Sequence, residues 1–525
     1  MTALRFSMTK KKSEPNGEST PLAEHPDLAV FSRIRAEGLS RSQVMELAWV
    51  ITDRFGPRFA NSPSYDAAAA WARDKFEQFG LVNAALEAWG EFGYGWENRY
   101  ISAHMVAPRY QPLIAYAVPG TRSTEGPVKG TPVLVQVDTI MKRSDLDPYR
   151  GRLAGRLVLT HVPRELEPNY QPQAVRLSDK ELEEMARPDD GHSRTLDDGE
   201  AGSKLSREES LAWSELETFF ESEGVAAVLS PGMPNVGPMD KGLVTVTGQG
   251  PLPLNSSPML PRIIVAAEHY NRIARLLAKG DKPELLVESR NQLLDDDPLD
   301  YNILAEIPGG DLANEVVMIG AHLDSQPSGT GATDNAAGSA VVMEAVRLLK
   351  AADAQPRRTI RAALWGAEES GHLGSLGYVA KHFGNGEAGE GSDERAGFYV
   401  YFNVDWYGRF RGIYLQGNDE ARPIFEAAMK PLHDLGMEWI VPGNTGGTDH
   451  MSFLKSGLPA FQFIQDDLEF FNVAFHTNMD VFDRLVEEDL QQASVVLASF
   501  AYHAATRDGQ FPYSDGLNNG RRWHK

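Results

Sequence analysis

The most regular pattern of apolar and polar residues lies after residue 293. Short apolar runs, typical of buried strands, alternate there with segments whose apolar residues recur at helical spacing. Strands are predicted at 301–307, 316–321, 359–365, 398–404 and 458–464, and helices near 335–351, 371–383, 420–435 and 486–504. Because this alternation is typical of βαβ units, the sequence predicts an α/β fold with a mostly parallel central sheet flanked by helices.

The N-terminal part of the chain has a different character. Residues 1–25 are polar and rich in Lys, Ser, Pro and Glu, so we expect a disordered leader. Residues 26–124 contain helical patterns at 40–55 and 65–79, followed by strand signals at 82–89 and 96–118. We expect residues 26–124 to form the first part of the α/β domain.

Residues 125–292 are predicted to form a separate β-rich insertion domain. Their short strand signals are separated by long polar connections, and the connection at 164–222 is dense in Asp, Glu and Ser. The strand signals lie at 133–137, 156–162, 225–230 and 262–267. The α/β domain is expected to resume over 293–506, and a polar tail over 507–525 is expected to fray.

The composition excludes several classes of binding partner and of metal site. The 525 residues include 51 Lys and Arg against 73 Asp and Glu, a formal charge of −22, which argues against a nucleic-acid or anionic-membrane partner. There is no cysteine, so disulfides and thiolate zinc sites are excluded, and any metal site must use His, Asp and Glu. No apolar run is long enough to predict a membrane span, and the sequence as given begins without a recognisable signal peptide.

Potential metal ligands and proton acceptors follow the predicted strands. In open α/β sheets, ligands bind at the carboxyl ends of the strands, so side chains in these positions can meet at one edge. The residues in question are His322, Asp324 and Asp334 after 316–321, Glu368 and Glu369 after 359–365, Asp405 after 398–404, and His476 after 458–464.

These residue types suit two metal ions about 3.5–4 Å apart, which need one shared carboxylate and two further ligands each. Asp334 would bridge the ions. One ion would take His322 and Asp405, and the other Glu369 and His476, with an open position left for water.

Two carboxylates remain outside this set. Adjacent residues cannot easily both reach one ion, so Glu368 is expected to act as the general base that takes a proton from the attacking water. Asp324, two residues after His322, is placed to orient the imidazole. Taken singly, a His-x-Asp pair is more often structural and a Glu-Glu pair more often solvated surface. The ordered combination at strand ends favours a metal site.

The motifs around these residues resemble those of a known family. AHLDSQPSGTGATDNAAG, GAEESGHLGS, NVDWYG, GGTDHMSFLKSGLPAFQF and HTNMD are similar to the motifs of two-zinc exopeptidases that include bacterial leucyl aminopeptidase, plasma glutamate carboxypeptidase and glutamate carboxypeptidase. The resemblance implies two Zn²⁺ per chain, for which Mn²⁺ or Co²⁺ can substitute, and a peptide or dipeptide substrate. The implied zinc ligands are His322, Asp334, Glu369, Asp405 and His476, with Glu368 as base. It also implies a periplasmic or secreted location.

Many members of this family carry a protease-associated domain inserted in the catalytic domain. RLAGRLVLTHV, GVAAVLSPG and LPRIIVAAEHYNRIARLLAKG are similar to its elements. Such a domain would roof the cleft or restrict access to it, or serve as a packing or assembly module.

One position departs from the family pattern. Phe475 precedes the last expected ligand, where several relatives have a tyrosine whose hydroxyl stabilises the oxyanion. Tyr407 is a candidate replacement. Trp406 is expected to be a packed aromatic or to line the substrate pocket, and Asp449 and His450 to shape the pocket wall.

The sequence thus predicts a metal-dependent exopeptidase, with an aminopeptidase favoured. A carboxypeptidase or dipeptidase of the plasma glutamate carboxypeptidase type stays open. Another hydrolase on this scaffold, such as an amidohydrolase or a one-zinc cyclase, is a rival, although the complete two-metal ligand set argues against the cyclase. A non-catalytic, receptor-like protein is a further rival, but such proteins typically lose a ligand or the base. The oligomeric state cannot be read from the sequence.

Overall fold

The structure is a computed structural model that describes residues 24–166, 168–170, 172–187, 211–232, 242–248, 250–384 and 393–513. The expected leader at 1–25 lies almost entirely outside the described residues. Among the described residues, no helix has the length and apolar character needed to cross a bilayer.

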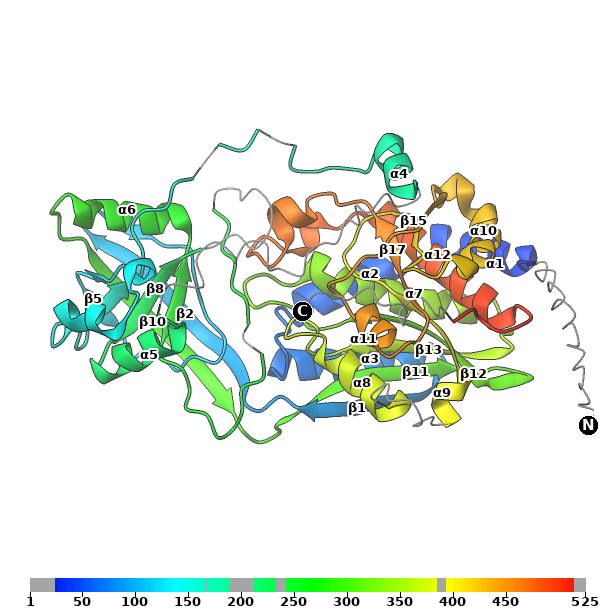
Figure 1. The fold of residues 1–525 in the computed structure, drawn as a ribbon, viewed down its shortest axis with the longest axis horizontal. Coiled ribbons are helices and arrows are strands. Elements are labelled where there is room, and N and C mark those ends of the chain that lie inside the picture. Colours follow the sequence, from blue (N-terminus) through cyan, green and yellow to red (C-terminus); the bar gives the residue numbers. More distant parts are fainter. Residues whose placement is uncertain are drawn as a thin grey trace, which may run out of the picture.

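An eight-stranded sheet forms the larger part of the molecule (Figure 1). Its order is β1 (Val82–Glu91), β11 (Leu299–Ile307), β13 (Arg358–Trp365), β12 (Leu312–His322), β14 (Phe398–Asn403), β17 (Ala460–Gln465), β15 (Phe410–Tyr414) and β16 (Trp439–Val441). The central strands β13, β12, β14 and β17 are parallel, as predicted. Antiparallel pairs join β1 to β11, β11 to β13 and β15 to β17, so the whole sheet is mixed.

Helices cover both faces of this sheet, which confirms the predicted α/β fold. One face packs against α1 (Leu28–Ser40), α2 (Val44–Trp49), α3 (Pro63–Gln78), α7 (Ala337–Ala351), α10 (Arg422–Met429) and α12 (Glu487–Thr506). The other packs against α8 (Leu373–Phe383) and α11 (His450–Lys455), with α9 (Asp393–Gly397) nearby. Because strand side chains alternate between faces, Val317 and Met318 of β12 lie in different core clusters.

Two predicted helices are interrupted. The expected helix 40–55 is wrong at its start, because α1 ends at Ser40 and α2 begins only at Val44, continuing as a π-helical turn over Val50–Arg54. The expected helix 420–435 consists of α10 and a 3₁₀ segment, Lys430–Leu435. Pro431 lies at the junction, and its missing amide hydrogen prevents regular continuation of the helix.

Two smaller sheets lie to one side of the main sheet (Figure 1). One contains β3 (Gln111–Pro112), β2 (Gly95–Ala107), β10 (Glu284–Leu294) and β5 (Val128–Gly130). The other contains β4 (Ala115–Ala117), β9 (Arg262–Val265), β8 (Ala227–Pro231), β7 (Leu157–Leu159) and β6 (Val133–Leu134), with α5 (Trp213–Ser222) and α6 (Ala267–Ala278). The chain leaves the main sheet after β1 and returns to it at β11.

One stretch of the long polar connection reaches back to the main sheet. The helix α4 (Asp179–Ala186) lies beside β15 and β17 in Figure 1. Just before it, Val175 pairs with Leu468 through two backbone hydrogen bonds, and Arg176 Nη1 lies 2.7 Å from the buried carboxylate of Asp466. This stretch therefore contacts the loop that follows β17.

The C-terminal tail is partly ordered, so the prediction that it frays from residue 507 is wrong for residues 507–513. Phe511 is buried and packs against Tyr399, Phe425 and Phe461. An aromatic side chain that covers the main core stabilises this short stretch without regular secondary structure. Residues 514–525 lie outside the described part.

Candidate metal centre

The carboxyl edge of the central parallel strands gathers the residues that the sequence singled out. His322 ends β12, while Glu368 and Glu369 follow β13. Asp405 follows β14, and His476 lies in the loop beyond β17. Asp334 lies before α7, at the end of the loop that begins at His322.

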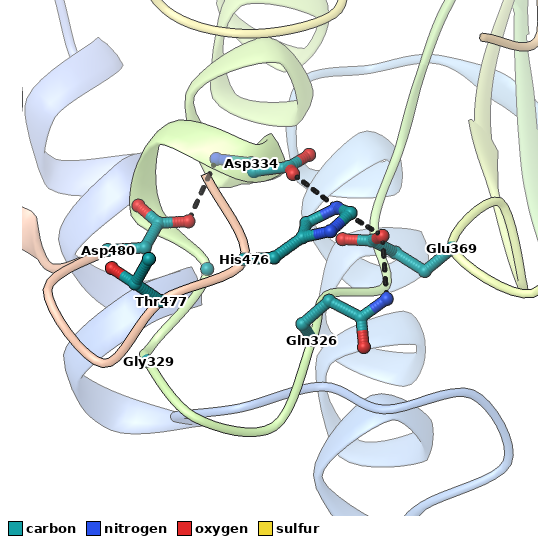
Figure 2. Close-up of a pocket in the computed structure, with 8 residues that line it drawn as sticks. Gln326, Gly329, Asp334, Glu369, His476, Thr477 and Asp480 are labelled. Atoms are coloured by element: carbon teal, nitrogen blue, oxygen red, sulfur yellow. Dashed lines mark hydrogen bonds and ion pairs between the residues drawn. The ribbon is translucent and has the colours of Figure 1, made fainter. Parts of the chain in front are cut away.

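Two groups of three ligand atoms form at this edge, and Asp334 belongs to both. In the first, Nε2 of His322 lies 3.2 Å from Oδ1 of Asp334 and 3.4 Å from Oδ1 of Asp405. In the second, Nε2 of His476 lies 3.2 Å from Oδ2 of Asp334 and 2.9 Å from Oε2 of Glu369 (Figure 2). The two oxygens of one carboxylate thus face two separate clusters.

The geometry of the nitrogen and oxygen atoms in the two clusters suits metal coordination better than hydrogen bonding between them. Nε2 of His322, Oδ2 of Asp334 and Oε1 of Glu369 are buried and have no hydrogen-bond partner among the described residues, although the first two lie close to other ligand atoms of the clusters. Buried polar atoms without a partner are rare and costly in proteins. Nitrogen and oxygen atoms that converge without hydrogen-bond geometry match ligands directed at a cation.

The charge balance supports the same interpretation. Burial lowers the pKa of His322, but Glu368, Asp405 and the contacts with Asp324 and Asp334 raise it well above the usual value. Burial also lowers the pKa of His476, but the carboxylates of Glu369 and Asp334 outweigh burial and raise this pKa well above its usual value. The carboxylates therefore create a strongly negative site that favours positive charge at both imidazoles or cations in place of those protons.

Asp324 lies behind the first cluster, where the sequence predicted an orienting residue. Nδ1 of His322 is 3.1 Å from the carbonyl oxygen of Asp324 and 3.4 Å from its Oδ1. Since both neighbours accept hydrogen bonds, the hydrogen belongs on Nδ1 and Nε2 faces the cluster. The carboxylate of Asp324 also accepts from the amides of Glu368 and Glu369, at 3.1 and 3.2 Å. One buried side chain therefore orients parts of both clusters.

Glu368 is buried beside the clusters. Its pKa is raised to about 7 by burial, which outweighs the opposing charges of His322 and His372. Nε2 of His372 lies 3.2 Å from Oε1 of Glu368. A carboxylate with such a pKa can both accept and release a proton near neutral pH.

Three further residues support the site, and the sequence alone did not single them out. Nε2 of Gln326 donates to Oε2 of Glu369 at 2.9 Å. Asp480 accepts a hydrogen bond from the amide of Asp334 at 3.2 Å (Figure 2). Arg58, fully buried, donates to the carbonyls of Leu323 at 2.7 Å and Gly331 at 2.9 Å. Gln326 and Asp480 stand inside the quoted motifs, but no sequence signal connects Arg58 with a loop more than 260 residues away.

The aromatic candidates have mainly packing contacts. Tyr407 is buried in the core, and its hydroxyl accepts from the amide of Glu469 at 3.1 Å, so the structure gives no support to the expected oxyanion role. Trp406 packs against Phe470 and Phe471, and Phe475 stacks on the imidazole of His476 with ring centroids 3.7 Å apart. Asp449 and His450 are buried, and Nε2 of His450 lies 2.9 Å from the carbonyl oxygen of Thr445.

A pocket opens onto the second cluster (Figure 2). Its lining consists of Gln326, Gly329, Gly331, Asp334, Glu369, His476, Thr477 and Asp480. Residues 244–248, which lie between β8 and β9, border this region. Asn478 and Val244 exchange two hydrogen bonds, and the amide of Gly248 donates to Oε1 of Gln326 at 2.6 Å.

Similar proteins were found by sequence. Carboxypeptidase Q from Rattus norvegicus is 24% identical over 496 residues, which cover 94% of this chain and 92% of that protein. Carboxypeptidase Q from Mus musculus is 29% identical over 259 residues, where the match spans 49% of this chain and about half, 52%, of the mouse protein.

Solved structures share the fold. A peptidase M28 precursor from Shewanella amazonensis is 24% identical, with a TM-score of 0.63 over 93% of this chain and 99% of that one. A zinc aminopeptidase from Bacillus subtilis is 19% identical, with a TM-score of 0.54 over 89% of this chain and 95% of that one. Residues 302–501 match the model of peptidase family M28, and they contain all five expected ligands and Glu368. The predicted class, a metallopeptidase hydrolase, is confirmed, and residues 302–501 are similar to peptidase family M28.

Proposed function

We propose that this protein is a two-zinc exopeptidase that removes residues from the amino end of peptides. The observation that carries the proposal is the pair of ligand clusters that share Asp334. A carboxylate with one oxygen for each ion is the arrangement that two adjacent catalytic metals require.

Five residues would hold the two zinc ions, and one of them would bind both. His322, Asp334 and Asp405 would hold one zinc ion, and Asp334, Glu369 and His476 the other. When bound, zinc supplies Lewis-acid polarisation of the peptide carbonyl and favours deprotonation of water near pH 7. The other residues of the site orient these ligands and move protons.

Glu368 would act as the general base. It would accept the proton of the attacking water on a carboxylate oxygen and later deliver it to the leaving amine. Its buried position, which raises its pKa to about 7, suits both halves of this transfer. Asp324 would hold the backbone of Glu368 through the 3.1 Å hydrogen bond and keep His322 in the tautomer whose Nε2 is free for metal.

The charge of the chain favours an amine over a carboxylate. Two of the carboxylates that line the pocket, those of Asp334 and Glu369, are proposed zinc ligands, so bound zinc would neutralise their charge. The formal charge of −22 acts at longer range and attracts the protonated α-amine of a substrate more than a terminal carboxylate.

The position of the smaller sheets favours cleavage at the end of a peptide over cleavage in its interior. Residues 95–294, which include the proposed protease-associated insertion at 125–292, bring residues 244–248 against the loop that follows His476. We propose that this contact closes one side of the cleft. A closed side would exclude the interior of a long peptide and admit its end.

A carboxypeptidase or dipeptidase is the second candidate, because rat carboxypeptidase Q aligns along nearly the whole chain. Matched dipeptides with free or acetylated amino ends separate the two. An aminopeptidase hydrolyses leucine p-nitroanilide and the free dipeptides but not the acetylated ones. A carboxypeptidase would instead hydrolyse the acetylated dipeptides at an undiminished rate, and a dipeptidase would hydrolyse the free dipeptides but not leucine p-nitroanilide.

Metal content tests the centre itself. Elemental analysis of the purified protein is expected to give two zinc ions per chain, and chelation is expected to remove both the metal and the hydrolysis. One ion per chain after remetallation would contradict the shared-carboxylate assignment. Mn²⁺ or Co²⁺ is expected to restore activity after chelation, because the nitrogen and oxygen ligand set accepts all three metals.

A further inference from the structure

A tight turn after β13 brings the side chain of His372 beside Glu368. The carbonyl oxygen of Glu368 accepts hydrogen bonds from the amides of Gly371 and His372, both at 2.8 Å. His372 adopts a left-handed backbone conformation, φ +59°, which is uncommon for residues other than glycine but is adopted more readily by asparagine, aspartate and histidine than by the rest. The chain then enters α8, whose first residue is Leu373.

The backbone of His372 is fixed from both sides. Its carbonyl oxygen accepts from the amide of Leu376 at 2.9 Å and from the hydroxyl of Ser375 at 3.2 Å. None of these contacts needs an imidazole. The side chain is therefore free to serve another purpose, and its Nε2 lies 3.2 Å from Oε1 of Glu368.

Both partners are largely removed from water. The side chain of Glu368 is 9% exposed and that of His372 is 20% exposed. Burial lowers the pKa of His372, but its contact with Glu368 and the charges of Glu368 and Asp449 raise it to about 9. A protonated imidazole beside a carboxylate forms an ion pair, whose attraction water screens less at a buried site than at the surface.

We propose that His372 is a positioning residue for the general base: its Nε2–H holds one carboxylate oxygen of Glu368 and leaves the other to face the attacking water. A glutamate carboxylate rotates about its last side-chain bond, so an anchor on one oxygen fixes the direction of the other. Small errors in the placement of a reacting group reduce rates strongly. This inference rests on the proposed function, because it assumes that Glu368 is the base.

Two substitutions form a matched pair. His372→Asn keeps a residue that tolerates the left-handed backbone but is too short to reach Glu368. His372→Gln keeps a side-chain N–H donor at nearly the reach of Nε2. Both proteins are assayed with zinc loaded, and zinc content and melting temperature are measured first.

The expected result is a loss of kcat without a loss of metal. His372→Asn should keep two zinc ions, lower kcat by about 10–100-fold and change KM by less than about threefold. His372→Gln should recover most of that loss. Full kcat in His372→Asn with zinc retained would overturn the proposal, as would equal losses in both variants.

A measurement that does not depend on enzymatic activity tests the contact between His372 and Glu368 independently of the proposed function. Selective ¹³C labelling of histidine, with the His372 signal identified by its absence in His372→Asn, follows the imidazole by NMR in the zinc-loaded protein. The pKa of His372 should fall in Glu368→Gln, since the partner loses its charge. An unchanged pKa would overturn the contact. A wild-type protein that binds zinc, shows this NMR shift and hydrolyses no peptide would refute the proposed function and leave the contact itself standing.

Discussion

The amide nitrogen of Asp334 donates a hydrogen bond to the carboxylate of Asp480, 3.2 Å away. The same carboxylate accepts from the amide of Thr333 at 2.6 Å and from its hydroxyl at 2.8 Å. The residue proposed to bridge two metals is thus held by a carboxylate that lies four positions after His476, itself a proposed ligand. One buried side chain couples the two loops that meet at the centre.

Asp480→Ala should weaken both folding and metal binding. It leaves the amides of Thr333 and Asp334 buried without an acceptor, which costs roughly 2–3 kcal/mol of unfolding free energy. Zinc affinity should fall by about 10–100-fold, as is usual when an outer partner of a ligand is lost. Competition with a chelator measures the affinity, and Asp480→Asn, which keeps one acceptor oxygen, is the control. Zinc affinity unchanged in the alanine variant would show that Asp334 needs no such support.

Glu368→Ala should separate catalysis from metal binding. The variant should retain two zinc ions and lose roughly 10²–10⁴-fold in kcat, because only the proton acceptor is removed. Glu369→Ala is the matched control, since loss of a proposed ligand should reduce zinc content. Normal turnover by a zinc-loaded Glu368→Ala protein would refute the role of general base.

Arg58 should prove important for stability even though it lies far from the ligands in sequence. Its guanidinium donates to the carbonyls of Leu323, Thr330 and Gly331, all in the loop between His322 and Asp334. Arg58→Met leaves these buried carbonyls without a donor and should lower the free energy of unfolding by about 3 kcal/mol or more. Urea unfolding measures this loss. Arg73→Met, which alters an exposed arginine, is the control and should have little effect.

The N-terminal contact of Glu24 should make folding sensitive to acid. Burial raises the pKa of Glu24, but the imidazole of His503, 3.2 Å from Oε2, and hydrogen bonds from Arg507 lower it from 4.5 to about 2. Because the folded-state pKa is the lower one, the contribution of Glu24 is present above about pH 4.5 and is lost as the pH falls toward 2. Thermal unfolding of the wild type and Glu24→Gln should therefore differ above pH 5 and converge near pH 2. A constant difference over this range would contradict the assignment.

The sequence predicted the central strands of the fold and the residue types of the proposed metal centre. Apolar runs located the strands that carry His322, Glu369 and Asp405, because buried parallel strands require continuous apolar residues. The residue types at their ends then allowed only nitrogen and oxygen ligands, and the structure brings those residues together in two clusters that share Asp334. Local pattern was sufficient there because each residue lies next to a strand end.

The supporting contacts could not be predicted in this way. Arg58 reaches the loop after β12 from the N-terminal segment, and residues 244–248 reach Gln326 and Asn478 from between β8 and β9. The antiparallel edges of the main sheet and the packing of Phe511 also depend on residues distant in sequence.

The sequence by itself determined the α/β class, the positions of the central strands and the types of group available for chemistry, since apolar periodicity and residue identity are local properties. Only the tertiary structure decided which oxygen of Asp334 faces which imidazole, that His372 reaches Glu368, and that Tyr407 is engaged in the core. These relationships depend on backbone paths and side-chain directions, which close packing of the whole chain fixes and which no local pattern encodes.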